Sequence, residues 1–518
     1  MLSPGLNLPL RDWDEGIVAR VALERAQAIQ ALLQGNGSLR ELLLPSYWGA
    51  PYLNKPPGLH LLIGLALQPW LASPAPPPAW AVRLVPALLA SAVVPLAAAI
   101  TSCLRPNNRA AALASAAVAL TLLPLMRHGR LAMLDGALVS ASGLLWWQLL
   151  RARQPNQQRW AGLWAGLGGS GLLLLKAPLL LPVLGAALLL LALDRLLNQR
   201  QWLGLLLALA LGLLPGLAWH LLHLFSRGEG ALLLWSGDGA ARVLLSAGEG
   251  SALGWRMPLL KVLEGGWPWL PLWPFAVASA LRQRHTSAGR WPLGLQLAMA
   301  ASVLPLRTQL PWYSHILWLP FALLIGPLLA DFAVAPPKQW LLRQLPWLWM
   351  LLGVGLLLAS AIALPSAIAI TLPAGLGLLL GGACLLRRPA GWRRLGLGLL
   401  AGGWWLALLM LMQGPLWHWE LNEQPPVAPA AALLRQADPR LPLALWQLPE
   451  RPSLSWQAQR RLLPLPPPPP GQPVAAQQLL SHHPPGSSAP VPQLANQRCR
   501  PQAPEQDGWL LWLCSPAP

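Results

Sequence analysis

Long apolar runs, rich in leucine and alanine, recur through most of this 518-residue chain and limit what it can fold into. Each run has about 20 residues, enough for an α-helix to cross the hydrocarbon core of a bilayer. Only 11% of the residues are charged and 55% are hydrophobic, whereas soluble domains carry about 25% charged residues. The sequence therefore predicts an all-α polytopic membrane protein with about 11–13 transmembrane helices.

Basic residues outnumber acidic ones, with 37 Lys and Arg against 18 Asp and Glu and a formal net charge of +19. Arginine clusters, such as Arg282, Arg284 and Arg290, occupy short loops after every second predicted span. Cytoplasmic loops of membrane proteins collect such residues, so these loops are assigned to the cytoplasm. No basic face interleaved with stacking aromatic residues is seen, and no nucleic acid partner is expected.

The segment Gly58–Trp70 decides which side the first polar loop faces. It offers about 13 apolar residues between proline-rich breaks, too few to span comfortably, and its length suits an interfacial or re-entrant helix. If it does not cross, the loop before it is extracytoplasmic, as are the polar segments at 127–135, 176, 223–257 and 307–313. The predicted location is the plasma (inner) membrane, with the active site on the periplasmic side.

Three regions follow from these assignments. Residues 1–79 are predicted to form an external catalytic loop with amphipathic and interfacial helices, and residues 80–414 a transmembrane bundle. Residues 415–518 are predicted to form a small extracytoplasmic domain, partly disordered, because proline and glutamine become frequent there. The stretches Leu443–Leu448 and Trp509–Leu513 are typical of strands. Cys499 and Cys514 can form a disulfide if that domain faces an oxidising compartment.

An acidic pair, Asp14 and Glu15, precedes a lone lysine, Lys55, by about forty residues in the first polar loop. The carboxylates alone are explained as first-turn residues of a helix over Gly16–Leu33, and Lys55 alone as an interfacial lysine whose amine reaches water. Together they suit a reaction in which a base deprotonates an acceptor while a phosphate leaves. The combination favours an enzyme.

Two further ionisable residues lie at the external ends of predicted spans. Asp135 begins a span, and such a residue indicates function by default; an ion pair with Arg127 or Arg130 is the equal alternative. Lys176 interrupts an apolar run, and a helix-end lysine that reaches the interface would also explain it.

Several motifs, in the same order, resemble those of the polyprenyl-phosphate-sugar-dependent glycosyltransferases of the GT-C fold. This family includes lipid A aminoarabinose transferases and bacterial relatives of protein O-mannosyltransferases. The similar stretches cover roughly residues 12–330. They are the acidic pair with GAPYLNKPPGLHLL, RLVPALLA from Arg83, RHGRLAMLDGALV with Asp135, LLLLKAPLLLPVL with Lys176, and LPWYSHILWLPFALL with Tyr313 and His315.

The resemblance implies roles for particular residues. Asp14 corresponds to the general base, Glu15 and Asp135 to auxiliary acidic groups, and Lys55 to the main cation that holds the donor phosphate. Further donor-binding candidates are Arg83, Arg127, Arg130, Lys176, Arg242, Tyr313 and His315. The expected partners are a polyprenyl-phosphate sugar as donor, a lipid, glycan or protein acceptor, and membrane lipids. No cofactor and no metal site are expected, although the metal requirement is left open.

Other classes of function remain as alternatives. A transporter or flippase of a lipid-linked sugar would place charged residues deep within spans and break helices in mid-bilayer. A membrane scaffold leaves the pairing of Asp14 with Lys55 unexplained. The family also places a transmembrane helix before its acidic pair, whereas 13 residues precede Asp14 here. A start downstream of the true one is the favoured explanation, and a loop translocated without that helix is the alternative.

Overall fold

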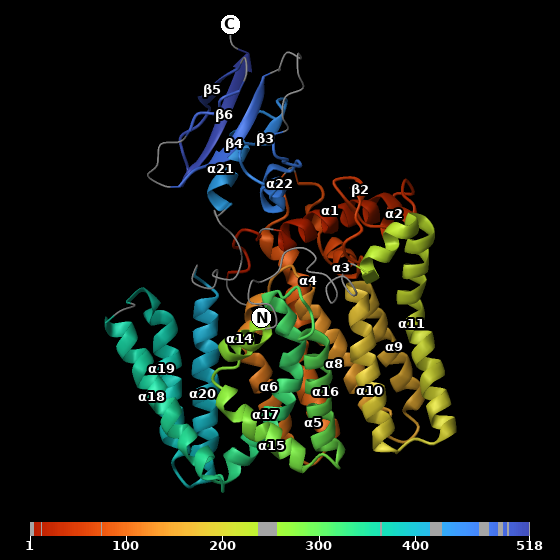
Figure 1. Ribbon diagram of the computed structural model, residues 1–518, viewed down its shortest axis with the longest axis vertical. Helices are drawn as coiled ribbons and strands as arrows, with labels where there is room; N and C mark the ends of the chain where they lie inside the picture. The colour runs from red at the N-terminus through yellow and green to blue at the C-terminus, as the bar shows by residue number, and fades with distance from the viewer. Residues whose placement is uncertain are drawn as a thin grey trace.

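The structure is a computed structural model that describes residues 5–11, 13–73, 75–236, 256–362, 365–414, 427–465, 476–484, 490–494 and 497–516. Upright helices form a bundle, a layer of short elements covers one end of it, and a small sheet stands above that layer (Figure 1). The predicted all-α class with a small C-terminal domain is therefore confirmed.

The bundle contains the described helices between residues 79 and 411, both the long apolar ones and the short ones that join them. In chain order they are α4 (Ala79–Ser91), α5 (Val93–Leu104), α6 (Arg109–Leu120), α7 (Leu123–Gly129), α8 (Asp135–Arg151), α9 (Gln158–Lys176), α10 (Leu180–Asp194), α11 (Gln199–Arg227), α12 (Leu233–Trp235), α14 (Arg256–Gly265), α15 (Trp273–Arg282), α16 (Ser287–Val303), α17 (Trp318–Val334), α18 (Trp340–Ile362), α19 (Ile368–Leu385) and α20 (Ala390–Leu411). Short 3-10 turns connect several of them: η2 (Ala177–Leu179), η3 (Gly228–Leu232), η5 (Leu270–Leu272), η6 (Pro311–Leu317) and η7 (Pro365–Ala367).

Seven helical stretches in the described residues are long and apolar enough to cross a membrane, or up to eight if the bent pair α6–α7 counts as one span. The stretch Gln158–Asp194 consists of α9 and α10, which the sequence counted as two spans. Its two ends lie near each other, because Gln158 bonds to Ala152 and the neighbouring Arg153 pairs with Asp194 at 3.5 Å, so the chain turns back at η2 as two spans require. One predicted span, Leu259–Leu281, is two shorter helices, α14 and α15. The break between them contains Gly265, Gly266 and Pro268, residues that interrupt helices.

Small residues allow a close helix contact in the bundle, between α9 and α11. A Cβ on Gly166 would stand 2.8 Å from the Cα of Gly212, so only glycine fits on either helix at this crossing. Ser170, one turn further along α9, donates its hydroxyl to the carbonyl of Gly212 at 2.8 Å. Small residues at four-residue spacing let membrane helices approach and hydrogen-bond in this way.

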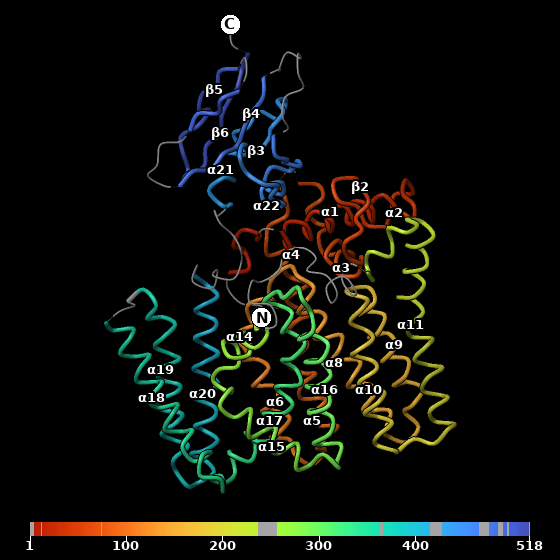
Figure 2. Tube along the Cα trace, viewed as in Figure 1, coloured from red at the N-terminus to blue at the C-terminus, as the bar shows by residue number. Residues whose placement is uncertain are grey.

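The layer over the bundle is built from the first 70 residues. Its elements are α1 (Asp14–Leu33), α2 (Leu39–Leu43), β1 (Ser46–Tyr47), β2 (Ala50–Pro51), α3 (Gly58–Ala66) and η1 (Gln68–Trp70). The path of the chain runs across the end of the bundle here (Figure 2). The predicted helix over Gly16–Leu33 is confirmed and begins two residues earlier. The short apolar segment Gly58–Trp70 is a nine-residue helix followed by a 3-10 turn, as its length predicted.

The C-terminal region is an α/β unit with its own core. It comprises α21 (Ala428–Gln436), β3 (Leu443–Leu445), α22 (Pro452–Ala458), β4 (Gln477–His482), β5 (Gln497–Pro501) and β6 (Trp509–Pro516). The strand order is β3-β4-β6-β5, with β3 parallel to β4 and the other pairs antiparallel. Cys499 and Cys514 are cross-strand partners and form a disulfide. The two predicted strands are therefore present, and so is the disulfide that the sequence allowed.

This C-terminal unit rests on the first turn of α1. A Cβ on Gly16 would stand 2.6 Å from the carbonyl carbon of Pro452 and from the nitrogen of Ser453, so α22 contacts the α1 backbone directly. The turns from α10 to α11 and from α15 to α16, which carry arginines, lie at the opposite end of the bundle (Figure 1). The predicted separation of the plain arginine clusters from the polar loops is thus seen in the fold.

Candidate active site

A cavity of about 120 Å³ lies where the first layer meets the bundle. Five separate segments bring to it two carboxylates, Asp14 and Asp135, two amines, Lys55 and Lys176, and the phenol ring of Tyr313. Its other lining residues are Ile17, Val18, Tyr52, Asn54, Met133, Leu134, Leu138, Leu310 and Trp312. Five of the eleven site residues predicted from the sequence therefore share one cavity.

Helix ends present most of these side chains to the cavity. Asp14 is the first residue of α1 and Asp135 the first of α8, where a carboxylate interacts favourably with the helix dipole. Lys176 is the last residue of α9, where the dipole favours a cation. These three charged residues therefore stabilise their helices whether or not they take part in a reaction. Helix stabilisation and a catalytic role are compatible explanations of their positions.

Lys176 and Tyr313 contact each other inside the cavity. The Lys176 Nζ lies 4.5 Å from the centroid of the Tyr313 ring, within the range of a cation–π interaction. Tyr313 belongs to η6 and is 8% exposed. The ring therefore fixes the position of the amine without neutralising its charge, which leaves a cation able to attract an anion.

Glu15, beside Asp14, is fully buried and does not line this cavity. Its carboxylate accepts two hydrogen bonds from Arg83, Nε to Oε1 at 2.7 Å and Nη2 to Oε2 at 2.6 Å. It also accepts the backbone N–H groups of Arg11 and Ala132, each at 2.8 Å. Burial by itself would raise the pKa of the Glu15 carboxyl, but the Arg83 charge and these hydrogen bonds hold the pKa below its usual value.

Arg83, on α4, uses every N–H group of its guanidinium. Besides Glu15, it donates to the carbonyls of Leu6 at 2.8 Å, Leu8 at 2.6 Å and Pro9 at 3.0 Å. The buried pair therefore ties the chain before α1 to α4 and to the segment before Asp135. This geometry favours a positioning role for Glu15 and Arg83, and their predicted direct roles stay predictions.

Three other predicted phosphate ligands contact groups outside the cavity. Arg127 forms an ion pair with Glu264 at 3.2 Å, and Arg130 donates to the carbonyl of Met412 at 3.1 Å. Burial, and after it the Arg83 charge, lower the pKa of Arg130 to about 10, although Glu15 acts in the opposite sense. His315 is 2% exposed and lies within 3.0 Å of the Pro124 carbonyl.

Arg242 lies outside the described residues, as does most of the loop around it. The beginning of that loop, predicted from residue 223, is helical: α11 continues to Arg227 and is followed by η3 and α12. The roles predicted for Arg127, Arg130, Arg242 and His315 stay predictions.

His60, which the sequence argument did not single out, supports the loop that carries Lys55. The ring of His60 packs edge-on against Tyr52, which lines the cavity, with centroids 5.6 Å apart. The His60 Nδ1 lies 3.2 Å from the carbonyl of Pro56, next to Lys55. Burial lowers the pKa of His60 to about 4. The imidazole is therefore neutral near pH 7 and donates its Nδ1–H to Pro56, which fixes the turn after Lys55.

The described part of the chain contains no group of three or more His, Cys, Asp or Glu side chains that could hold a metal ion. Positive charge at the cavity comes from Lys55 and Lys176. The expectations of no metal and no cofactor stay predictions.

Comparison with known proteins gives one family and one closely similar fold. The sequence model of the family described as dolichyl-phosphate-mannose-protein mannosyltransferase matches residues 67–227. No curated protein sequence matches the chain. The crystal structure of ArnT from Cupriavidus metallidurans in the apo state has a TM-score of 0.71 and 16% identity, over 98% of this chain and 95% of that one.

The same protein bound to undecaprenyl phosphate gives a TM-score of 0.68, again with 16% identity over 98% of this chain and 95% of that chain. An archaeal oligosaccharyltransferase, AglB from Archaeoglobus fulgidus, has a TM-score of 0.48 and 12% identity, over 90% of this chain and 62% of that one.

The long apolar helices and the shared fold describe a multi-pass membrane protein, and residues 67–227 of it match the mannosyltransferase family model. It is similar in fold, over nearly its whole length, to ArnT of Cupriavidus metallidurans. The resemblance inferred from its motifs is therefore confirmed.

Proposed function

We propose that this protein transfers a sugar from a polyprenyl-phosphate carrier to an acceptor hydroxyl on the external face of the plasma membrane. The observation that carries the proposal is the cavity that joins Asp14 and Asp135 with Lys55 and Lys176. ArnT of the same fold binds undecaprenyl phosphate, which supports this class of donor. The acceptor is a lipid, a glycan or a protein.

The proposed chemistry divides the cavity between a base and a phosphate site. Asp14 accepts the proton of the acceptor hydroxyl as its oxygen forms a bond to the anomeric carbon of the sugar. The bond from that carbon to the phosphate oxygen breaks with inversion, and the polyprenyl phosphate leaves with the electron pair. Lys55 and Lys176 stabilise the negative charge that develops on the phosphate, and Asp135 orients the acceptor.

The C-terminal disulfide supports the external location. Disulfides such as Cys499–Cys514 persist in oxidising compartments and are rare in the cytosol. The unit that carries it contacts α1, the helix that begins with Asp14. The cavity and the disulfide therefore lie on the same side of the bundle, with the arginine-bearing turns at the other end, as expected when those turns are cytoplasmic.

Transfer from radiolabelled polyprenyl-phosphate sugars by the purified full-length protein tests the proposal. Asp14→Asn is expected to lower turnover about 100-fold to 10,000-fold, the contribution of general base catalysis. Asp331→Asn is the matched control. Asp331 lies near the C-terminal end of α17, whereas η6 with Tyr313 precedes the N-terminal end, and Asp331 does not line the cavity. Equal turnover by Asp14→Asn and the wild type would remove Asp14 as the base. Movement of labelled lipid across proteoliposomes without transfer to any acceptor would favour the transporter.

A further inference from the structure

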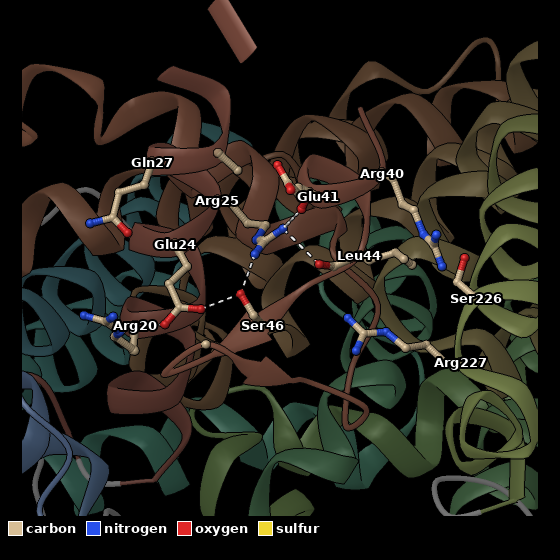
Figure 3. A pocket seen from close by; sticks show the side chains of 12 residues that line it. Arg20, Glu24, Arg25, Gln27, Arg40, Glu41, Leu44, Ser46, Ser226 and Arg227 are labelled. Carbon is tan, nitrogen blue, oxygen red and sulfur yellow. Dashed lines mark hydrogen bonds and ion pairs between the residues drawn. The ribbon is translucent and has the colours of Figure 1, made fainter. Parts of the chain in front are cut away.

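A second cavity, of about 590 Å³, opens between α1, α2 and the end of α11 (Figure 3). Four arginines line it, Arg20, Arg25, Arg40 and Arg227, together with two carboxylates. None of them lines the cavity of Asp14. Arg25 lies about 16 Å from Asp14 along α1. Val18 lines the first cavity and Arg20 the second, and a two-residue spacing places them on opposite faces of that helix.

Two of the four arginines serve the local structure. Arg25 donates to the carbonyls of Leu42 at 3.1 Å and Leu44 at 3.0 Å, and to the Ser46 hydroxyl at 2.7 Å. These bonds hold the segment between α2 and β1 against α1. The Arg20 guanidinium lies 3.7 Å from the centroid of the Trp48 ring and pairs with Glu24.

The carboxylates of this cavity are also engaged locally. Glu24 binds Arg20 at 2.8 Å and accepts the Ser46 hydroxyl at 2.5 Å. Glu41 accepts the backbone N–H of Ser38 at 3.2 Å and so closes the capping box of α2. No ion pair within the described residues joins Arg40 or Arg227 to either carboxylate, and four arginines against two carboxylates leave the cavity a net positive charge.

Arg40 and Arg227 reach the cavity from α2 and from α11 (Figure 3). Arg227 donates one bond, to the Pro45 carbonyl at 3.3 Å. Within the described residues, the buried Nε atoms of Arg227 and Arg25 have no hydrogen-bond acceptor. Burial lowers the pKa of Arg25, and Arg227 lowers it further although Glu24 raises it. A bound anion would accept these N–H groups and relieve the repulsion between the cations.

Exposed apolar side chains near Arg227, at the C-terminal end of α11, indicate which kind of anion this cavity binds. Phe225 is 85% exposed beside Arg227, and Leu39 is 60% exposed beside Arg40. The stretch that contains Arg227, Gln199–Trp235, is itself a candidate membrane span. Basic pockets at the ends of membrane helices, next to apolar surface, suit lipid headgroups. We propose that Arg40 and Arg227 bind the phosphate of an anionic membrane lipid at a site separate from the donor phosphate site.

This proposal does not depend on sugar transfer and is tested by binding. The full-length protein, in an uncharged detergent, is titrated with fluorescent phosphatidic acid. A Lys55→Gln background removes the main cation of the other cavity. Arg40→Gln with Arg227→Gln is expected to lower the affinity about 30-fold, from the loss of two cations near the membrane surface. Arg40→Lys with Arg227→Lys is expected to retain most of the affinity, because both positive charges remain.

Three controls make the result specific. Arg109→Gln removes an exposed arginine at the first turn of α6, outside this cavity, and is expected to leave binding unchanged. Arg40→Gln alone, at an exposed position, is expected to lower the affinity about fivefold and serves if Arg227 proves necessary for folding. Equal affinity in the double variant, equal affinity for phosphatidylcholine, or binding of inorganic phosphate without the lipid would overturn the proposal.

Discussion

The buried ion pair between Glu15 and Arg83 permits a quantitative test of what Glu15 does. Both side chains are fully buried, and the carboxylate accepts four hydrogen bonds of 2.6–2.8 Å. In Glu15→Gln the charge is lost, and the amide NH₂ faces groups that are themselves donors. Breaking a buried pair on one side leaves an uncompensated charge and costs about 3–5 kcal/mol. We expect Glu15→Gln to lower the free energy of unfolding by that amount.

Unfolding by denaturant in a mild detergent can be followed by tryptophan fluorescence, since the chain has 30 tryptophans. A double-mutant cycle with Glu15→Leu and Arg83→Met separates the pair from its surroundings. The double variant is expected to lose less stability than either single variant, because no buried charge is left alone.

The pH dependence has a defined sign. The folded pKa of Glu15 lies below the reference value of 4.5, so its stabilisation is present above pH 4.5 and is lost as the pH falls through the folded pKa. Unchanged stability of Glu15→Gln, combined with loss of transfer, would refute the positioning role and favour direct participation of Glu15 in the chemistry.

Further predictions concern the phosphate site, the bundle and the C-terminal unit. Lys176→Gln is expected to lower kcat/KM for the donor about 10-fold to 100-fold, with partial rescue by arginine, in steady-state assays. Transfer should persist in EDTA, because lysines supply the positive charge; loss of activity that Mg²⁺ or Mn²⁺ restores would contradict this. Gly166→Leu should lower the thermal midpoint, since it overlaps Gly212 on α11 and overpacking costs about 1–3 kcal/mol. Cys514→Ser opens a loop of sequence separation 15 and should destabilise the C-terminal unit by about 3 kcal/mol, measured by proteolysis.

The sequence predicted the cavity residues that sit at helix ends. Asp135 and Lys176 lie at predicted span boundaries, and boundaries on one side of a membrane bring such residues to one surface. Asp14 was predicted from its place beside Glu15 in the first polar loop. Lys55 was predicted from its pairing with the acidic residues of the same polar loop, and Tyr313 from a family motif rather than from spacing. The fold brings these residues into one cavity, and this cannot be predicted from the hydrophobic periodicity of the sequence alone.

Predictions for the buried arginines were limited by distant contacts. The partner of Arg83 is 68 positions away and that of Arg127 is 137 positions away, so nothing local distinguishes an arginine that binds phosphate from one that holds two segments together. The strand Gln477–His482 was missed because its sequence, QQLLSH, shows no alternation of apolar and polar residues, although its four central residues are buried. The break between α14 and α15 was also missed, although Gly266 and Pro268 interrupt the predicted span Leu259–Leu281.

The contact at Gly16 has a consequence for how such proteins diversify. The backbone of the helix that begins with Asp14 is also the surface on which Pro452 and Ser453 rest. Any side chain larger than a hydrogen atom at position 16 would push the sheet unit away from the rest of the protein. A different C-terminal unit would therefore also need a surface that packs directly on the backbone of α1 at Gly16. The first turn of α1 and the C-terminal unit are thus expected to change together in evolution.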